Sequence, residues 1–274
     1  FKPDVIARAK TYLSKAFKGG IGAYTDSRGS RYVREEVANF IHQRDGGPVP
    51  DPDRIFFTNG AGAGVQAVMQ MLIRDHHDAV MTPIPQYPLY SASINVFGGS
   101  LLPYHLDEDN AWSFNFDQMS ADVAKAKKEG KHAKALVSIN PGNPTGACLE
   151  RETIEGLIKF AHEHKIVLLA DEVYQENVYQ SERPFISIRK VLHQMGAPYS
   201  NEVEVISFHT VSKGAFGECG WRGGYIQMEN IDAEVAGQLY KMMSVQLSPA
   251  VPAQVILGCM VNPPKYIFYS IIQI

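Results

Sequence analysis

The 274-residue chain has only three cysteines, and no two of them form a CxxC pair. A sparse, odd cysteine count argues against the disulfide framework of a small secreted protein and is typical of a reducing compartment. Long apolar runs are also lacking: stretches such as 166–170 are far shorter than the roughly 20 residues that a membrane-spanning helix needs. No membrane partner is therefore expected.

Charge of one sign is not in excess either. The chain carries 26 lysines and arginines against 29 acidic residues, a formal net charge of -3, and has no basic run. Such a balance gives no excess of positive charge that would indicate binding to nucleic acid or to an acidic membrane surface. The length and the 45% hydrophobic content suit one large globular domain, or a large domain with part of a second.

Several familiar catalytic motifs are missing. The chain contains no GxGxxG, no GxxxxGK[ST] and no GxSxG, which argues against a classical dinucleotide site, a P-loop and an α/β-hydrolase. The sequence HEH at 162–164 lacks the HExxH spacing of a zinc site, and the pair at 76–77 has no evident partner. No metal site is predicted.

Short apolar runs do alternate with helix-length amphipathic segments. We predict strands at 55–58, 79–82, 101–104, 135–139, 166–170, 203–208 and 223–228. We predict helices at 6–17, 32–44, 65–73, 119–129, 153–164 and 233–243. This alternation predicts an α/β fold, with a mostly parallel sheet and helices on both faces.

Chemically suggestive residues follow several of these predicted strands. Ligands of parallel sheets bind at the carboxyl ends of the strands, so residues there should meet at one rim. Five segments meet this condition: 60–62, 86–87, 140–146, Asp171 and 210–213. The sequence therefore predicts a binding site at this rim.

Lys213 is the most suggestive of these residues. It lies in a loop of small and polar residues, with Gly214 and Gly217 close behind, and a desolvated lysine amine can form an imine with a carbonyl. Arg222 follows, and a guanidinium is the usual planar partner of a phosphate. Taken alone, Lys213 also fits a surface lysine beside a turn, and Arg222 fits a structural ion pair.

Asp171 follows an apolar strand, where burying a carboxylate is costly without a cation. A protonated pyridine nitrogen would supply one, although a helix N-cap or an ion pair also fits. Tyr174 either donates a hydrogen bond to a ligand or packs. Asn143 lies in the proline-rich turn NPGNPTG, which fixes its orientation or serves only as a turn.

Two further segments fit a ligand that has a phosphate and a ring. TNGAGAG, at 58–64, opens a predicted helix after a strand, and the free N–H groups at a helix start suit a phosphate. Tyr87, in PQYPLY, has a ring that could stack on an aromatic ligand.

Together these segments resemble the fold-type I pyridoxal-phosphate aminotransferases, and within them the alanine aminotransferase family, which includes the plant glutamate–glyoxylate aminotransferases. The matching segments are AYTDSRG (23–29), PQYPLYSA (86–93), INPGNPTG (139–146), LADEVYQ (169–175) and SKGAFGECGWRGGY (212–225). The resemblance extends from about residue 20 to Lys265 and implies the large domain of that fold.

The resemblance also implies roles around pyridoxal 5'-phosphate. Lys213 would hold the cofactor as a Schiff base and then shuttle the proton between substrate and cofactor. Asp171 would pair with the pyridinium nitrogen, while Tyr174 and Asn143 would bind the ring's phenolic oxygen. Tyr87 would stack on the ring face.

The phosphate would be held by Ala61, Gly62, Thr210 and Arg222 by the same resemblance. Tyr24 matches a tyrosine that reaches the phosphate of the neighbouring subunit, which implies a homodimer. The implied reaction moves an amine between an amino acid, alanine or glutamate, and a 2-oxo acid, namely 2-oxoglutarate, pyruvate or glyoxylate. The compartments implied are the cytoplasm and, alternatively, mitochondria or peroxisomes.

The chain departs from the family in two ways. Gly62 stands where the family usually has a serine, and after Lys265 the long C-terminal portion of the family is not matched. That portion supplies most of the small domain and the arginine that grips the substrate carboxylate. We therefore expect a segment of the small domain or dimer arm at 1–30, the cofactor-binding large domain at 31–265 and an atypical tail at 266–274, with the small domain largely missing.

Two alternatives to an active aminotransferase remain. One is a truncated, catalytically incompetent chain that binds the cofactor or acts only as an interaction partner. The other is a pyridoxal-phosphate lyase or decarboxylase on the same fold, against which the GECG and RGGY motifs argue.

Overall fold

The computed structural model describes residues 1–263, so the expected tail at 266–274 lies outside the described residues. Eight strands form one sheet: β1 (Ile55–Thr58), β2 (Asp78–Ile84), β3 (Ser100–Asp107), β4 (Ser113–Phe114), β5 (His132–Ile139), β6 (Val167–Asp171), β7 (Val205–Thr210) and β8 (Gly224–Glu229). Their order across the sheet is β1-β8-β7-β6-β5-β2-β3-β4. The strands β3, β2, β5, β6 and β7 pair in parallel, whereas β8 runs antiparallel to both its neighbours. The predicted mostly parallel sheet is confirmed.

Ten α-helices are described, most of which pack on the sheet. They are α1 (Pro3–Thr11), α2 (Arg31–Asp45), α3 (Ala61–Leu72), α4 (Leu89–Val96), α5 (Phe116–Lys128), α6 (Arg151–His164), α7 (Ile188–Met195), α8 (Tyr199–Glu202), α9 (Ala233–Ser244) and α10 (Val251–Val261). Side chains cap several starts: Asn115 accepts from a backbone N–H of α5, Ser187 from one of α7, and Asp232 from two of α9. Such caps satisfy N–H groups that the helix itself leaves free.

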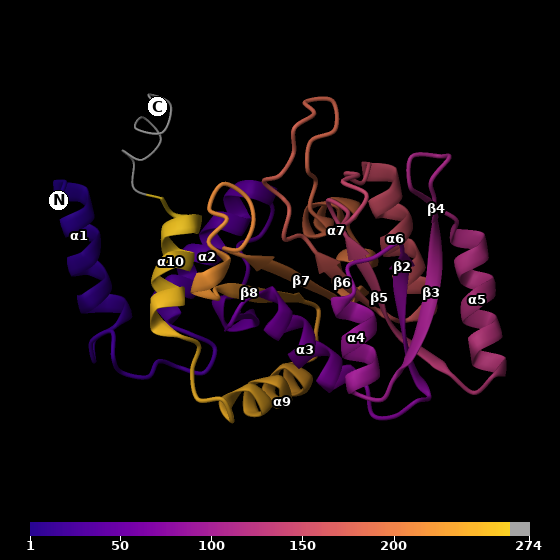
Figure 1. Cartoon of the computed structure of the whole chain (residues 1–274), viewed down its shortest axis with the longest axis horizontal. Helices are drawn as coiled ribbons and strands as arrows, with labels where there is room; N and C mark the ends of the chain where they lie inside the picture. Colours follow the sequence, from indigo (N-terminus) through magenta and orange to yellow (C-terminus); the bar gives the residue numbers. More distant parts are fainter. Residues whose placement is uncertain (264–274) are drawn as a thin grey trace.

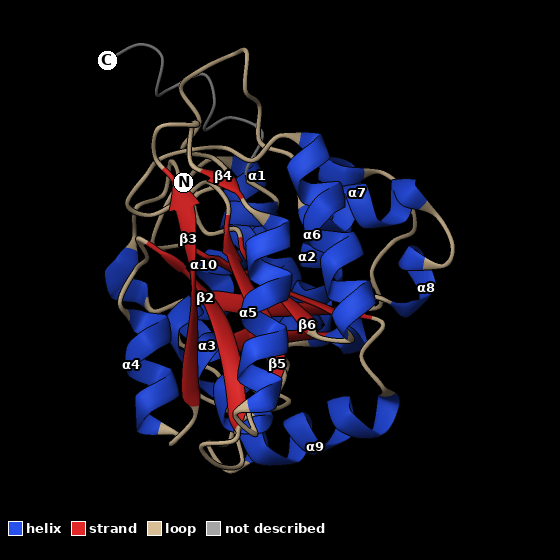
Figure 2. Ribbon diagram, turned by 90° about the vertical axis from the view of Figure 1, so that its right-hand side faces the viewer, coloured by secondary structure: helices blue, strands red, loops and turns tan. Residues whose placement is uncertain are grey.

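Helices lie on both faces of the sheet (Figure 2), and an apolar layer separates them from each face. One layer buries residues of α3, α4 and α9 against one face. The other buries residues of α5, α6 and α7 against the opposite face. A third cluster joins α2 and α10 beside β1, at the end of the molecule where α1 also lies (Figure 1). Helices on both faces, as predicted from the alternation, leave the strand ends as the place for a site.

The strand register aligns those ends. Ile139 of β5 lies beside Asp171 of β6, and Asp171 lies beside Phe208 of β7. Because β8 runs the other way, its first residue, Gly224, pairs with Thr58 at the end of β1 and with Thr210 at the end of β7. The segments after β1, β5, β6 and β7 therefore emerge at the same edge as the segment before β8.

Some predicted boundaries are wrong. The helix predicted at 6–17 is α-helical only through Thr11 and continues as a π-helical turn, Tyr12–Ala16, which buries the Tyr12 ring against Phe17 and Tyr32. Asp171 and Thr210 are the last residues of β6 and β7 and do not follow the strands. The four helices α4, α7, α8 and α10 were not predicted.

Candidate functional site

A cavity of about 290 Å³ lies at the aligned strand ends. Nine of the ten candidate residues line it: Ala61, Gly62, Tyr87, Asn143, Asp171, Tyr174, Thr210, Lys213 and Arg222. Ala61 and Gly62 begin α3, and Tyr87, Asn143 and Lys213 follow β2, β5 and β7. Asp171 and Thr210 end β6 and β7, Tyr174 lies in the turn after β6, and Arg222 lies in the turn before β8. The structure therefore brings together residues that the sequence spreads over more than half of the chain.

Lys213 lies in the loop between β7 and β8. Its Nζ is 5.2 Å from the centre of the Tyr174 ring. The backbone N–H of Gly214 donates to Asn177 Oδ1 at 2.9 Å, and that of Ala215 donates to Glu176 Oε2 at 3.4 Å. These bonds tie the lysine loop to the segment after β6, so that the amine and Asp171 border the same cavity.

Asp171 is 5% exposed and carries its carboxylate at the end of β6. Its Oδ2 accepts a hydrogen bond from the Tyr90 hydroxyl at 2.7 Å, and its Oδ1 accepts one from the Val173 N–H at 3.4 Å. Burial raises the pKa of Asp171, while the bond from Tyr90 and the charge of Lys213 oppose that rise. Within residues 1–263 Asp171 has no ion-pair partner.

Asn143, Tyr174 and Tyr87 form the rest of the wall near the carboxylate. The Asn143 amide donates to the Tyr174 hydroxyl at 3.3 Å, which joins the turn after β5 to the turn after β6. Tyr87 is 48% exposed and lines the same cavity from the segment after β2. The wall thus offers an amide, a phenol and a partly exposed ring.

The other end of the cavity is cationic. Arg222 Nη1 donates to the Cys219 carbonyl at 2.8 Å and Nη2 to the Asn59 carbonyl at 3.2 Å, so the guanidinium lies against the start of α3. Gly60, the N-cap of α3, makes no side-chain cap and has a φ of 85°. The free N–H groups of the helix start and the adjacent guanidinium form a cradle for an anion such as a phosphate.

Thr210 and Gly62 border this cradle. The Thr210 hydroxyl donates to the Gly223 carbonyl at 2.7 Å and lies 3.0 Å from the Ser212 hydroxyl. A Cβ at Gly62 would meet only Leu89 Cδ2 at 3.8 Å, so the serine that the family usually has there would fit. Compared with a serine, Gly62 leaves more space in the cavity and offers no hydroxyl to a ligand.

The charges of the cavity are unbalanced within the chain. Arg222 bonds only to backbone carbonyls, and among the described residues neither it nor Lys213 forms a salt bridge. Within the same residues Asp171 forms no salt bridge, although the charge of Lys213 lowers its pKa. Buried charges are normally paired, so the buried carboxylate of Asp171 suits a cationic group of a ligand, and the exposed Arg222 guanidinium is available to an anionic group of the same ligand.

Tyr24, the tenth candidate, is outside the cavity. Its side chain is 76% exposed and it does not line the pocket. The sequence reasoning also missed residues, above all Tyr90, the closest hydrogen-bond donor to Asp171. The only sign of Tyr90 in the sequence is its position three residues after Tyr87 in PQYPLY.

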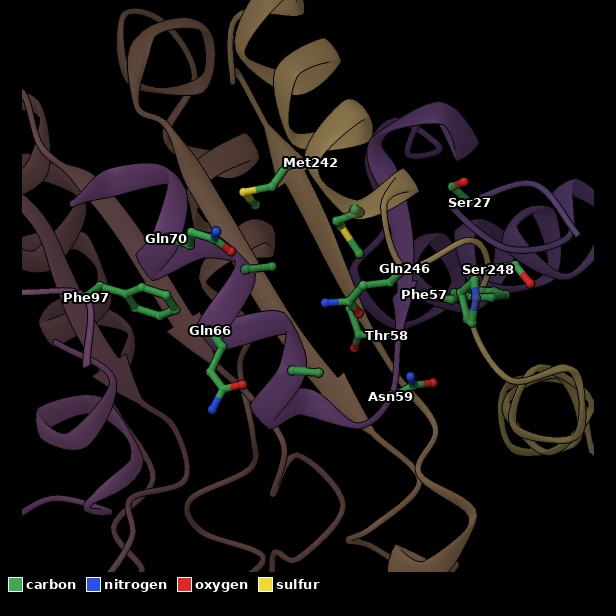
Figure 3. Close-up of a pocket in the computed structure, with 14 residues that line it drawn as sticks. Ser27, Phe57, Thr58, Asn59, Gln66, Gln70, Phe97, Met242, Gln246 and Ser248 are labelled. Atoms are coloured by element: carbon green, nitrogen blue, oxygen red, sulfur yellow. The ribbon is translucent and has the colours of Figure 1, made fainter. Parts of the chain in front are cut away.

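A second hollow, of about 140 Å³, lies between α3 and α9 (Figure 3). Gln66 and Gln70 of α3 and Met242 of α9 border it, but none of its fourteen lining residues is ionisable. Its hydroxyls, those of Ser27, Thr58 and Ser248, have no acid or base among the lining residues that could activate them. The chemistry-bearing residues belong to the other cavity.

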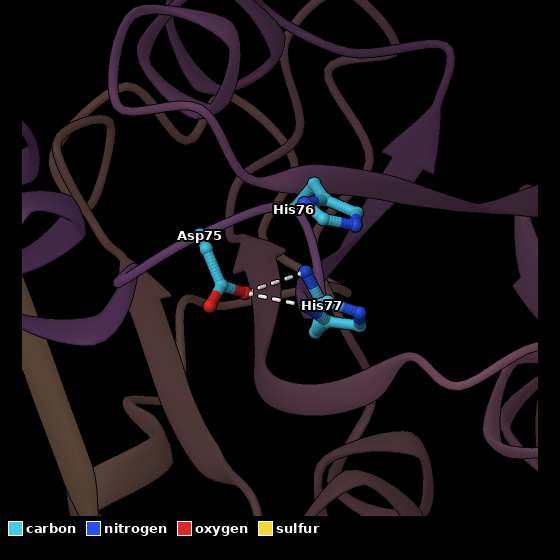
Figure 4. Close-up of side chains that lie close together, drawn as sticks. All are labelled: Asp75, His76 and His77. Carbon is cyan, nitrogen blue, oxygen red and sulfur yellow. Dashed lines mark hydrogen bonds and ion pairs between the residues drawn. The ribbon is translucent and has the colours of Figure 1, made fainter.

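The histidine pair at 76–77 does have a partner, contrary to the sequence interpretation (Figure 4). Asp75 Oδ1 is 3.0 Å from His77 Nδ1 and accepts from the His77 N–H at 2.8 Å. One ligand atom from each of Asp75, His76 and His77 lies within 4.8 Å of the others, and all three residues are exposed. This group precedes β2, at the edge of the sheet opposite the cavity, so it takes no part in the candidate site.

No helix in residues 1–263 is long and apolar enough to cross a membrane. Among curated proteins, the chain is 54% identical to glutamate–glyoxylate aminotransferase 1 of Arabidopsis thaliana over 265 residues, which cover 97% of this chain and 55% of that protein. It is 43% identical to alanine aminotransferase 1 of Homo sapiens over 267 residues, which cover 96% of this chain and 54% of that protein. The chain thus spans about half the length of the curated relatives it matches.

Solved structures give the same family. An alanine aminotransferase from Pyrococcus furiosus superposes with a TM-score of 0.80 at 25% identity, over 100% of this chain and 65% of that one. The family described as aminotransferase class I and II matches residues 2–267. With its sheet order, its cavity and these matches, the chain belongs to the class I and II aminotransferase family.

Proposed function

We propose that this chain binds pyridoxal 5'-phosphate in the cavity at the strand ends. The observation that carries the proposal is the unbalanced charge of that cavity: a buried carboxylate, Asp171, and a guanidinium, Arg222, both lack ion-pair partners in the described chain and border the same space as Lys213. A cofactor with a protonated ring nitrogen and a phosphate supplies the missing partner of each.

The chain's residues then divide into two groups by what they can hold. At one end the N–H groups of Ala61 and Gly62, the Arg222 guanidinium and Thr210 would bind the phosphate. At the other end Asp171 would bind the ring nitrogen.

The remaining contacts orient the ring. Asn143 and Tyr174, already bonded to each other, would donate to the ring oxygen, while Tyr87 would cover the ring face. With both ends and one face fixed, the reacting carbon would be held beside Lys213, and such positioning removes much of the entropic barrier.

We further propose transamination between an amino acid, alanine or glutamate, and a 2-oxo acid. When bound, the cofactor supplies an electron sink for the carbanion chemistry. Lys213 would hold the cofactor covalently and then take and return the substrate α-proton as a general base and acid. Tyr174 and Asn143 would hold the reacting groups in position beside the Lys213 amine.

The choice between alanine-type and glyoxylate-type substrates rests on the relatives. The Arabidopsis glutamate–glyoxylate enzymes are 53–54% identical to this chain, and the alanine aminotransferases of animals 43–44%. This difference favours glutamate with glyoxylate. Tyr24, exposed and outside the cavity, would reach the phosphate of a neighbouring copy, which supports a homodimer as part of the same proposal.

The test is the absorbance of the purified chain after addition of pyridoxal 5'-phosphate. We expect a visible band from covalently bound cofactor, and its loss on addition of alanine or glutamate. The Lys213→Ala variant should lack the band; a band that persists in the variant would refute the assignment of Lys213.

The same experiment separates the alternatives. A band that does not respond to either amino acid would support a chain that binds the cofactor without turnover. A response that releases carbon dioxide, or that forms no amino acid when glyoxylate or pyruvate is added, would support a decarboxylase or lyase. The absence of any band in the unsubstituted chain would refute cofactor binding altogether.

A further inference from the structure

We propose that Tyr90 is a positioning residue of the cofactor site. Its hydroxyl holds the Asp171 carboxylate in the anionic form and in the orientation that pairs with the ring nitrogen of pyridoxal 5'-phosphate. This inference rests on the proposed function and concerns a residue that does not itself line the cavity.

The first support is the geometry of the bond. Tyr90 belongs to α4 and Asp171 to β6, and the phenol oxygen lies 2.7 Å from Asp171 Oδ2. Tyr90 is fully buried in the apolar layer formed by α3, α4 and the sheet. Because its ring is enclosed by packing, the hydroxyl has a fixed position and cannot swing away to solvent.

The second support is that few other hydrogen bonds reach the Asp171 carboxylate. Besides Tyr90, the bond to Asp171 is that of the Val173 N–H, at the longer distance of 3.4 Å. Lys213 acts on the carboxylate through its charge, and among residues 1–263 it forms neither a hydrogen bond nor a salt bridge with Asp171. Tyr90 is therefore the principal group that fixes where Oδ2 points and leaves Oδ1 the freer of the two oxygens.

The third support is electrostatic. Burial favours the neutral form of a carboxyl group, whereas a hydrogen bond donated to the anion favours the charged form. Burial and the neighbouring carboxylate raise the pKa of Tyr90 well above 10, so the phenol remains a donor at physiological pH. Burial likewise raises the pKa of Asp171, and the bond from Tyr90 lowers it. A neutral Asp171 would lose its electrostatic attraction for a pyridinium.

The chain supplies a matched control in Tyr104 of β3. Tyr104 is 1% exposed, and its hydroxyl also donates a 2.7 Å hydrogen bond, but to the Val137 carbonyl within the sheet. Loss of either hydroxyl removes one buried hydrogen bond of equal length. Only Tyr90 bonds to a residue that lines the candidate site.

The experiment compares Tyr90→Phe with Tyr104→Phe by titration of each cofactor-free variant with pyridoxal 5'-phosphate, followed by absorbance. Because burial favours the neutral form of Asp171 and the Tyr90 bond opposes this, Tyr90→Phe should make the anion that pairs with the cofactor harder to form and raise the Kd about 10-fold, or about 1.4 kcal/mol. Tyr104→Phe should change the Kd less than about twofold, since its hydroxyl contacts no part of the site. Both variants should lose similar unfolding free energy.

A double-mutant cycle shows whether Tyr90 acts through Asp171. In the Asp171→Asn background, Tyr90→Phe should no longer weaken binding by the same factor, because there is no anion for the hydroxyl to stabilise. The pH at which the absorbance of the bound cofactor changes should also rise in Tyr90→Phe. A weaker contact with Asp171 would leave the ring nitrogen less protonated, and loss of that positive charge favours the protonated form of the linkage to Lys213. The midpoint should stay unchanged in Tyr104→Phe.

Two failures are distinguishable. If the unsubstituted chain shows no bound cofactor, the proposed function fails and this inference falls with it. If the unsubstituted chain binds the cofactor but Tyr90→Phe matches Tyr104→Phe in Kd and in pH midpoint, the proposed function stands and Tyr90 is only a packing residue. Full additivity in the double-mutant cycle would overturn the role through Asp171.

Discussion

Asp171 and Glu172 are consecutive carboxylates, both almost fully buried, in opposite surroundings. Asp171 faces the cavity, with Tyr90 as its close partner and no cation bonded to it. Glu172 faces the other way. One of its oxygens accepts from the Ile188 N–H at 2.8 Å, and the other lies 3.6 Å from Arg44.

The charged side chains around Glu172 are paired with one another within the chain. Arg44 makes two 2.7 Å bonds to Asp45 and one of 2.8 Å to Gln175, and Ser187 donates to Asp45 at 2.7 Å. These bonds join α2, the segment after β6 and the start of α7. The chain thus places a cation within salt-bridge distance of Glu172, whereas within residues 1–263 Asp171 forms no salt bridge, although burial raises the pKa of both carboxyl groups.

The largest effect is expected from removal of the Arg44 charge. Arg44→Met keeps an unbranched side chain of similar reach but leaves Glu172 buried without its cation, and leaves Asp45 with Arg189, at 3.8 Å, as its remaining one. Breaking a buried pair by removing one partner costs about 3–5 kcal/mol. Urea unfolding of the cofactor-free chain should show this loss, and a loss below about 1 kcal/mol would mean that Glu172 is not balanced by Arg44.

The next largest effect is expected on cofactor binding at Arg222, which forms no salt bridge with a carboxylate among residues 1–263. A Cβ at Gly60 would lie 2.2 Å from Arg222 Nη2, and Gly60 has a φ of 85°. Gly60→Ala should therefore displace the guanidinium and raise the Kd for pyridoxal 5'-phosphate about 10- to 100-fold, the value of a charge-assisted bond of about 1.5–3 kcal/mol. Gly220→Ala, in the turn Cys219–Trp221 just before Arg222, is the control: no atom lies within 4 Å of its added Cβ, so the Kd should stay unchanged.

Much of this site follows from the sequence because its residues lie next to strand ends. Parallel pairing brings such residues to one edge regardless of their distance along the chain. Nine candidates were found in this way and with the family resemblance, and they share one cavity.

What escaped prediction depends on side-chain packing. Tyr90 lies in α4, a helix that was not predicted, and nothing local indicates that its hydroxyl meets Asp171, which is 81 residues away. The bond between Arg44 and Gln175 spans 131 residues and is equally invisible. The helix α10 was missed because it is apolar on nearly every side, being buried, and so lacks the periodicity that marks an amphipathic helix.

Glu172→Gln tests the balanced side through pH. Burial raises the pKa of Glu172 from 4.5 to about 7, so between these values the folded chain binds more protons than the unfolded chain. The stability that this group contributes is present below about pH 4.5 and is lost as pH rises to about 7. Relative to the unsubstituted chain, Glu172→Gln should gain about 2 kcal/mol between pH 5 and pH 8 in urea unfolding. A pH-independent difference would contradict the raised pKa.

The smallest effect, and the one of opposite sign to Arg44→Met, is expected from Asp171→Asn in the cofactor-free chain. Because the pKa of Asp171 is raised by burial, its charge opposes folding above that pKa, and the isosteric amide removes the charge while its oxygen still accepts from Tyr90. We expect the variant to be more stable by about 1 kcal/mol at pH 8, with a smaller gain at low pH, where Asp171 is protonated in both states. A loss of stability at pH 8 would show that the chain already balances Asp171, and the contrast between the two carboxylates would fail.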